Sequence, residues 1–142
     1  MPDTHGPSRP MTRMEANALL PLVRGGLKRM RDIRDLVPKL QAQVEIEDLT
    51  GRAADGAIRP ESKAVMERIL GELKGLSRDF QEELESFTAM GARLKDLDQG
   101  LVDFFGQVAG ETVFLCWKEE EAEVGWYHPL DGGYRQRKPL EG

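Results

Sequence analysis

Residues 20–44, LPLVRGGLKRMRDIRDLVPKLQAQV, decide the fold, because apolar side chains recur in this stretch every three or four residues. Such spacing lays one apolar stripe along an α-helix. Upstream, Thr12 and Glu15 have the spacing of a capping box, in which each side chain accepts a hydrogen bond from the other residue's backbone N–H. We therefore predict a helix over residues 12–48. Its stripe consists of Leu20, Val23, Leu27, Met30, Ile33, Val37, Leu40 and Val44.

Prolines and glycines interrupt this first helix. Pro21 and Pro38 each remove one backbone hydrogen bond, so we expect a bend at each proline and no break. The Gly25-Gly26 pair weakens the helix by about 1 kcal/mol per residue relative to alanine. Such a pair is tolerated where another helix packs closely against it, and we therefore expect a close helical neighbour at this point.

A second helix is predicted over residues 60–90, after a turn at residues 50–59 that contains two glycines. Pro60 suits a first helical position, and Gly91 suits a left-handed cap after the last turn. Two long helices joined by a short turn form an antiparallel hairpin. The apolar stripe of this helix consists of Val65, Ile69, Leu73, Leu76, Phe80, Leu84 and Phe87.

The last third of the chain changes to short runs that are rich in Val, Phe, Trp and Leu, which is typical of strands. We predict strands at residues 92–97, 100–105, 112–118 and 123–128, joined by turns short enough to make neighbouring strands antiparallel. The predicted fold class is thus α+β, a long antiparallel helical hairpin followed by a small antiparallel β meander of about four strands. Residues 1–11 are expected to form a flexible tail, residues 12–142 a single domain, and residues 129–142 an irregular C-terminal tail.

Composition limits the class of protein. No apolar run approaches the ~20 residues that cross a bilayer, and the first ten residues do not resemble a signal peptide, so we expect a cytoplasmic protein without a membrane partner. The single cysteine, Cys116, cannot form an internal disulfide. With a net charge of −5, the chain is an unlikely nucleic-acid partner. We expect the basic cluster Arg24, Lys28, Arg29, Arg31 and Arg34 to pair instead with Asp79, Glu82, Glu83 and Glu85 of the second helix.

Four groups of residues carry a resemblance. The first is Thr12, Glu15, Ala16, Asn17, Leu20 and Pro21; the second is Lys95, Asp96 and residues 100–104; the third is Leu115, Cys116 and Trp117; the fourth is Glu121, Val124, Trp126, Tyr127, His128, Gly133 and Arg137. With these groups, nearly the whole chain resembles the prokaryotic protein family called domain of unknown function 2203. Members of that family usually have Trp where Tyr127 stands and Gly where Gln136 stands. The resemblance implies this fold and a set of candidate residues, but no activity and no cofactor.

The candidate site is the set of polar residues on or just after the meander. Asp103, His128 and Arg137 together could bind an anionic ligand or move a proton, and they are the candidate catalytic residues. The alternative is structural: Asp103 and His128 form a buried hydrogen-bonded pair, and Arg137 ties down the C-terminal tail. Trp117, Trp126 and Tyr127 are the candidate ligand-binding residues. We predict no metal site, since a lone cysteine is usually a small buried hydrophobe, although Cys116 and His128 are the residues that could converge on an ion.

Two functions from different classes follow. The first is an interaction or structural module that self-associates through its hairpin. The predicted helix of about 36 residues extends ~54 Å, whereas a strand of about six residues spans only ~20 Å, so the small sheet leaves apolar surface on the helices uncovered. We expect that surface to include part of Leu20, Val23, Leu27, Leu73, Leu76 and Phe80, and a homodimer would bury it. The second function is a small-molecule-binding domain or enzyme with its site around Asp103, His128 and Arg137.

Overall fold

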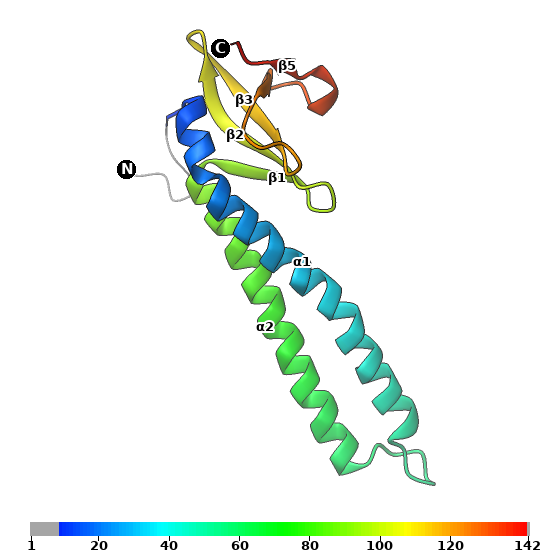
Figure 1. The fold of residues 1–142 in the computed structure, drawn as a ribbon. Helices are drawn as coiled ribbons and strands as arrows, with labels where there is room; N and C mark the ends of the chain where they lie inside the picture. Colours follow the sequence, from blue (N-terminus) through cyan, green and yellow to red (C-terminus); the bar gives the residue numbers. More distant parts are fainter. Residues whose placement is uncertain (1–8, 142) are drawn as a thin grey trace. The chain divides into compact units, whose positions relative to one another are not determined.

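The computed structural model describes residues 9–141, and they contain two long helices followed by an antiparallel sheet (Figure 1). The helices are α1 (Arg13–Thr50) and α2 (Pro60–Met90). The strands are β1 (Ala92–Asp96), β2 (Leu101–Val108), β3 (Glu111–Lys118), β4 (Trp126–His128) and β5 (Lys138–Pro139), with a short 3-10 helix, η1 (Tyr134–Gln136), before the last. The predicted fold class, an α+β chain with a helical hairpin and a β meander, is confirmed.

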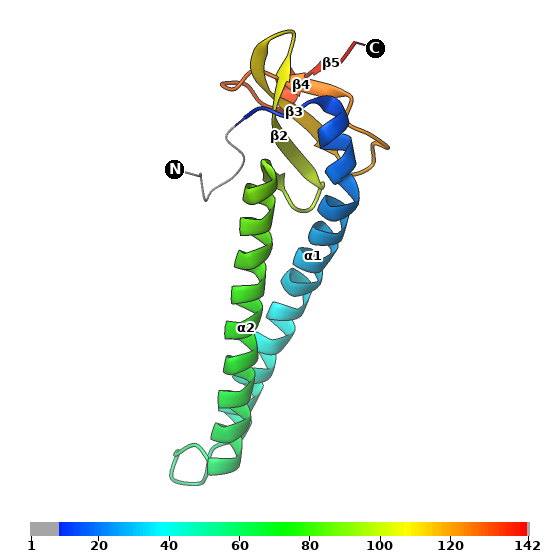
Figure 2. The same ribbon diagram turned by 90° about the vertical axis from the view of Figure 1, so that its left-hand side faces the viewer.

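By its internal contacts the chain divides into two compact units. One unit is the hairpin segment Arg29–Glu82, in which α1 and α2 run antiparallel beside each other (Figures 1 and 2). The other combines the chain up to Lys28 with the chain from Glu83 onward, and it contains the whole sheet. No helix among residues 9–141 is both long enough and apolar enough to span a membrane.

The helix termini follow the predicted local chemistry. The Glu15 N–H donates to Thr12 Oγ1 at 3.2 Å and the Thr12 N–H donates to Glu15 Oε1 at 3.0 Å, which completes the capping box. These bonds, with Arg9 at 3.0 Å, lower the pKa of the Glu15 carboxyl group. At the end of α2, Gly91 takes a φ of 83°, the left-handed conformation expected of a cap.

Close helix packing explains one of the two adjacent glycines. A Cβ atom added to Gly26 would lie 2.5 Å from Cε1 of Phe87, which is on α2. The predicted close helical neighbour at the Gly25-Gly26 pair is therefore present within the chain itself. α1 also continues as one helix through Pro21 and Pro38, so neither proline ends it.

The sheet has the strand order β1-β2-β3-β4-β5, so each strand pairs with its neighbour in sequence. In the central pair, Phe104 lies opposite Leu115 and Asp103 lies opposite Cys116. Alternation then separates two faces. We call the face of Phe104, Leu115 and Trp117 the helix face, since it carries the fully buried apolar core. We call the opposite face the tail face, since the C-terminal segment contacts it, and this face carries Asp103 and Cys116.

Both ends of the described segment, residues 9–141, are more regular than predicted. Residues 129–142 were expected to be irregular, but Lys138 and Pro139 pair with β4 as a fifth strand. The fourth strand begins only at Trp126, three residues after the predicted start. At the other end, Met11 is buried and its N–H donates to the Phe105 carbonyl oxygen at 2.9 Å, so the predicted flexible tail does not extend this far. Residues 1–8 of that tail lie outside the described residues.

Candidate functional site

Three buried polar side chains meet on the tail face of the sheet, one from each of three neighbouring strands. Asp103 of β2 lies opposite Cys116 of β3, and His128 of β4 pairs with Phe114, two positions along β3 from Cys116. Asp103 and His128 are each 2% exposed and Cys116 is fully buried. Strand alternation places all three on one face, and the register of the strands brings them together.

The Asp103–His128 pair is held by two hydrogen bonds. His128 Nε2 lies 2.9 Å from Asp103 Oδ2, and His128 Nδ1 lies 2.8 Å from the carbonyl oxygen of Pro129. A carbonyl oxygen only accepts, so Nδ1 must carry a proton and donate it. One further proton then lies between Nε2 and Oδ2, whether it belongs to an imidazolium or to a carboxylic acid. In either case the pair is neutral as a whole, which suits its burial.

The thiol of Cys116 lies beside this pair. Burial raises the pKa of the Cys116 thiol to about 12, and the charge of Asp103 acts in the same direction. The neighbouring Arg137 guanidinium group acts against that increase. Cys116 is therefore a neutral thiol near neutral pH unless another group replaces its proton.

This thiol gives the fold a defined alkaline sensitivity. The pKa of the thiol is about 12 in the folded chain and has an ordinary value of 9.0, so the folded chain holds the thiol proton more tightly than the unfolded chain does. The resulting contribution to the free energy of unfolding is complete below pH 9 and is lost as the pH rises toward 12. We expect the free energy of unfolding of the unaltered chain to fall by about 2 kcal/mol more than that of Cys116→Ala between pH 9 and about pH 10.5. Urea titrations across this range measure the difference. Parallel pH profiles of the two proteins would contradict the prediction.

Arg137 connects the C-terminal segment to the sheet. Its guanidinium group donates to both carboxylate oxygens of Glu121, at 3.3 and 3.1 Å. Its Cζ atom lies 4.4 Å from the centre of the Trp126 ring and 4.3 Å from that of Tyr134. Burial alone would lower the pKa of Arg137, but the hydrogen bonds and charge of Glu121 raise it above its ordinary value. Arg137 thus stays charged, and its charge is matched by the Glu121 carboxylate.

Glu121 is the main member of this network that the sequence reasoning missed. Its carboxylate also accepts from the Lys118 N–H at 2.8 Å, and its carbonyl oxygen accepts from Trp117 Nε1 at 3.0 Å and from Arg24 at 3.0 Å. It therefore fixes the turn between β3 and β4 and links that turn to α1. The sequence feature that could have identified Glu121 is its membership of the same motif group as Trp126, Tyr127 and His128.

Arg24 does not have the partners that were predicted for it. Its guanidinium donates to the carbonyl oxygens of Glu119 and Glu121 and lies 4.8 Å from the centre of the Trp117 ring. The predicted pairing of this arginine with acidic residues of α2 is wrong. The turn after β3 offers it carbonyl oxygens and an aromatic face at the same place, which exposed carboxylates of α2 do not.

The predicted site residues thus separate into two groups. Asp103, Cys116 and His128 form one cluster, and Arg137 and Trp126 lie beside it on the tail face. Trp117 and Tyr127 belong to the helix face, because Tyr127 pairs with Leu115 and Trp117 pairs with Val102. These two aromatic residues therefore do not line the same site as the polar cluster.

The cluster has a donor set suited to a metal ion as well as to a shared proton. The ligand atoms of Asp103, Cys116 and His128 all lie within 4.8 Å of one another. Among residues 9–141, no buried side-chain nitrogen or oxygen lacks a hydrogen-bond partner. The polar groups are therefore already satisfied by the protein, and a ligand of this cluster would have to replace protons and not fill vacant hydrogen bonds.

These features define a class of protein: an α+β chain in which a helical hairpin precedes an antiparallel five-strand meander with a buried Asp-Cys-His cluster on one face. The model of the uncharacterized conserved protein family DUF2203 matches residues 9–140, which is nearly the whole chain. The chain therefore belongs to this family, as its motifs indicated. Neither the curated proteins nor the solved structures provide a significant match.

Proposed function

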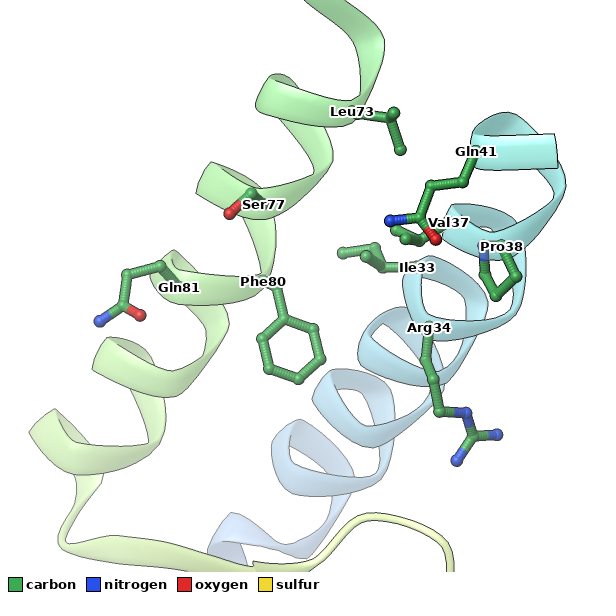
Figure 3. Close-up of a pocket in the computed structure, with 9 residues that line it drawn as sticks. All are labelled: Ile33, Arg34, Val37, Pro38, Gln41, Leu73, Ser77, Phe80 and Gln81. Carbon is green, nitrogen blue, oxygen red and sulfur yellow. The ribbon is translucent and has the colours of Figure 1, made fainter. Parts of the chain in front are cut away.

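We propose that this protein is an interaction module that self-associates as a homodimer through its helical hairpin. The observation that carries the proposal is an apolar groove of about 520 Å³ within the hairpin unit. The side chains of Ile33 and Val37 from α1 and of Leu73 and Phe80 from α2 point into the space between the helices (Figure 3). An exposed apolar groove on a small chain is typical of a surface that binds a partner.

An exposed leucine extends the groove along α2. Leu70 is 50% exposed and precedes Ser77, a groove residue, by seven positions, so it lies on the same side of the helix. Only part of the apolar helix surface that we expected to be uncovered is accessible. Leu20, Val23 and Leu27 are buried within the chain, whereas Leu73 and Phe80 are half-buried. The dimer would accordingly form through the segment Arg29–Glu82.

The charge pattern along the edge of the groove supports a second copy of this chain as the occupant. Arg34, Gln41 and Asp48 follow one another at intervals of seven residues, so they lie along one side of α1. This side of α1, which borders the groove at Arg34 and Gln41, is thus basic at its start and acidic beyond the groove at Asp48. Two copies of α1 packed antiparallel about a twofold axis at Gln41 would place Arg34 opposite Asp48 of the other copy, twice per dimer.

The existing partners of these two charges do not oppose the arrangement. Arg34 contacts the Asp35 carboxylate at 3.1 Å, and Asp48 contacts Arg52 at 2.8 Å. All four side chains are at least 40% exposed, and such surface pairs contribute only ~0–1 kcal/mol each. Exchange of these two ion pairs on dimerisation therefore costs little, while the apolar groove supplies most of the favourable free energy.

Charge reversal tests this arrangement. The unaltered protein is expected to have twice the chain mass of 16.0 kDa in light scattering at micromolar concentration. Arg34→Glu should weaken the dimer by roughly tenfold or more, because two attractive pairs become repulsive. The double variant Arg34→Glu/Asp48→Arg should restore it, since the pairs are re-formed with reversed signs.

Two variants show whether the dimer forms through the groove or through another surface of the hairpin. Leu70→Glu should produce monomers, because it places a charge on the apolar surface. Ile46→Glu is the matched control, since Ile46 is 58% exposed on the same unit but is not a groove residue, and it should leave the dimer intact. The proposal is overturned if the unaltered protein has a mass of 16.0 kDa at this concentration. It is also overturned if Leu70→Glu leaves the dimer as intact as Ile46→Glu does.

In this proposal the cluster on the tail face stabilises the sheet, because Asp103 and His128 are 2% exposed and hydrogen-bonded to each other. We also propose a cytoplasmic location. It is supported by the single thiol of Cys116, which is free and buried, as is usual for proteins of reducing compartments.

A further inference from the structure

Three different metal-binding side chains meet in one buried place on the tail face of the sheet. Asp103, Cys116 and His128 provide an oxygen, a sulfur and a nitrogen atom, all within 4.8 Å of one another. They come from three strands and are separated by at least twelve positions in the sequence. A thiolate, an imidazole and a carboxylate are all ligands that zinc accepts.

The orientation of His128 is compatible with metal binding. Its Nδ1 donates to the Pro129 carbonyl oxygen at 2.8 Å, which leaves Nε2 directed at the carboxylate of Asp103. A backbone carbonyl in this position is a usual outer partner of zinc-binding histidines, since it selects the tautomer with a free lone pair on Nε2. Two acceptor atoms, Nε2 and Oδ2, then face each other across 2.9 Å and need a cation or a proton between them.

The surrounding charges allow a divalent cation. One carboxylate and one thiolate would neutralise the charge of the ion. Arg137, which acts on the pKa of Cys116, is itself balanced by Glu121 at 3.1 Å. Because Glu121 balances its charge, the guanidinium group would not leave a net positive charge beside the site.

We propose that Asp103, Cys116 and His128 form a zinc site in this protein. We predicted no metal site from the sequence, because a lone cysteine is usually a small buried hydrophobe, and only Cys116 and His128 were candidate ligands. The third ligand becomes apparent only when the register of β2 and β3 places Asp103 opposite Cys116. Three protein ligands leave the fourth position of a tetrahedral zinc ion for water or another small ligand.

The test supplies the metal during folding, because all three ligands are buried. The chain is unfolded in urea with EDTA, refolded with Zn²⁺ or Co²⁺, and dialysed. We expect one bound ion per chain by elemental analysis. Refolded cobalt protein should show a thiolate-to-cobalt charge-transfer band, and zinc at about one hundred times the Kd should raise the Tm by roughly 10 °C relative to the EDTA-treated protein.

Matched variants assign the ligands. Cys116→Ser should abolish the charge-transfer band, and His128→Gln and Asp103→Asn should each weaken binding by more than about 100-fold, beyond the effect of losing an outer partner. His5→Ala removes the other histidine of the sequence and should change nothing. The proposal is overturned if the refolded protein, with normal circular dichroism, binds no more metal than Cys116→Ser or if its Tm does not respond to zinc.

Discussion

Replacement of His128 by alanine is expected to lower the free energy of unfolding of the metal-free protein by about 3–5 kcal/mol. The variant leaves the Asp103 carboxyl group buried and without the partner that now lies 2.9 Å away. It also removes the imidazole ring, whose centre lies 5.6 Å from the centre of the Phe114 ring. Urea unfolding in EDTA, followed by circular dichroism, measures the loss without interference from metal ions.

A double-mutant cycle separates the lost pair from the lost packing. Asp103→Ala/His128→Ala should be more stable than the sum of the two single effects predicts, by about 0.5–3 kcal/mol, because no buried group is then left without a partner. His128→Gln should have a free energy of unfolding between those of the unaltered protein and the alanine variant, because its amide can still donate a hydrogen bond to Asp103. Strict additivity of the two alanine substitutions would show that the two side chains do not depend on each other.

The second large effect is expected at Gly26. Valine at this position would place its Cβ 2.5 Å from Cε1 and 3.0 Å from Cζ of Phe87, whose side chain is 1% exposed and therefore has little room to move. We expect Gly26→Val to destabilise the protein by about 1–3 kcal/mol more than the same substitution at an open position of a helix.

Gly71→Val is that control, because a Cβ atom at Gly71 meets nothing within 4 Å. Both variants introduce the same β-branched residue into a helix, so their difference in Tm and in urea midpoint isolates the contact with Phe87. Equal effects of the two substitutions would contradict close packing at Gly26. In that case the glycine pair would need another explanation.

The helices could be predicted closely because their signals are local. The Thr12–Glu15 capping box, the stripe of apolar residues and Gly91 each act over one or two helical turns. The predicted segments 12–48 and 60–90 therefore agree with α1 and α2 to within two residues. The internal prolines, which weaken a helix, did not end it, because the continuous apolar stripe stabilises the helix through packing.

The sheet was less predictable at its ends. β5 consists of Lys138 and Pro139, which are too few to show alternation, and it exists because Trp126 and Tyr127 of β4 present a free edge to it. The chain before β4 is held instead by α1. The Val124 N–H donates to Asn17 Oδ1 at 2.6 Å and the Val124 carbonyl oxygen accepts from Arg13 at 2.7 Å, which explains the late start of the strand.

The sequence by itself determined the α+β class, the hairpin and the meander, because each depends on patterns among near neighbours. It also determined the family, because the motif residues can be recognised along the chain without knowledge of their contacts. It also identified Asp103, His128 and Arg137 as polar residues in need of partners. The sequence offered a buried Asp103–His128 pair as one of two alternatives, and the structure contains that pair at 2.9 Å. Only the tertiary structure decided the partners of the two arginines: Arg137 meets Glu121 across 16 positions, and Arg24 meets Glu119 across 95. Such pairings depend on strand register and on the paths of the connecting turns, and a few hydrogen bonds made far along the chain select them after the local elements have formed.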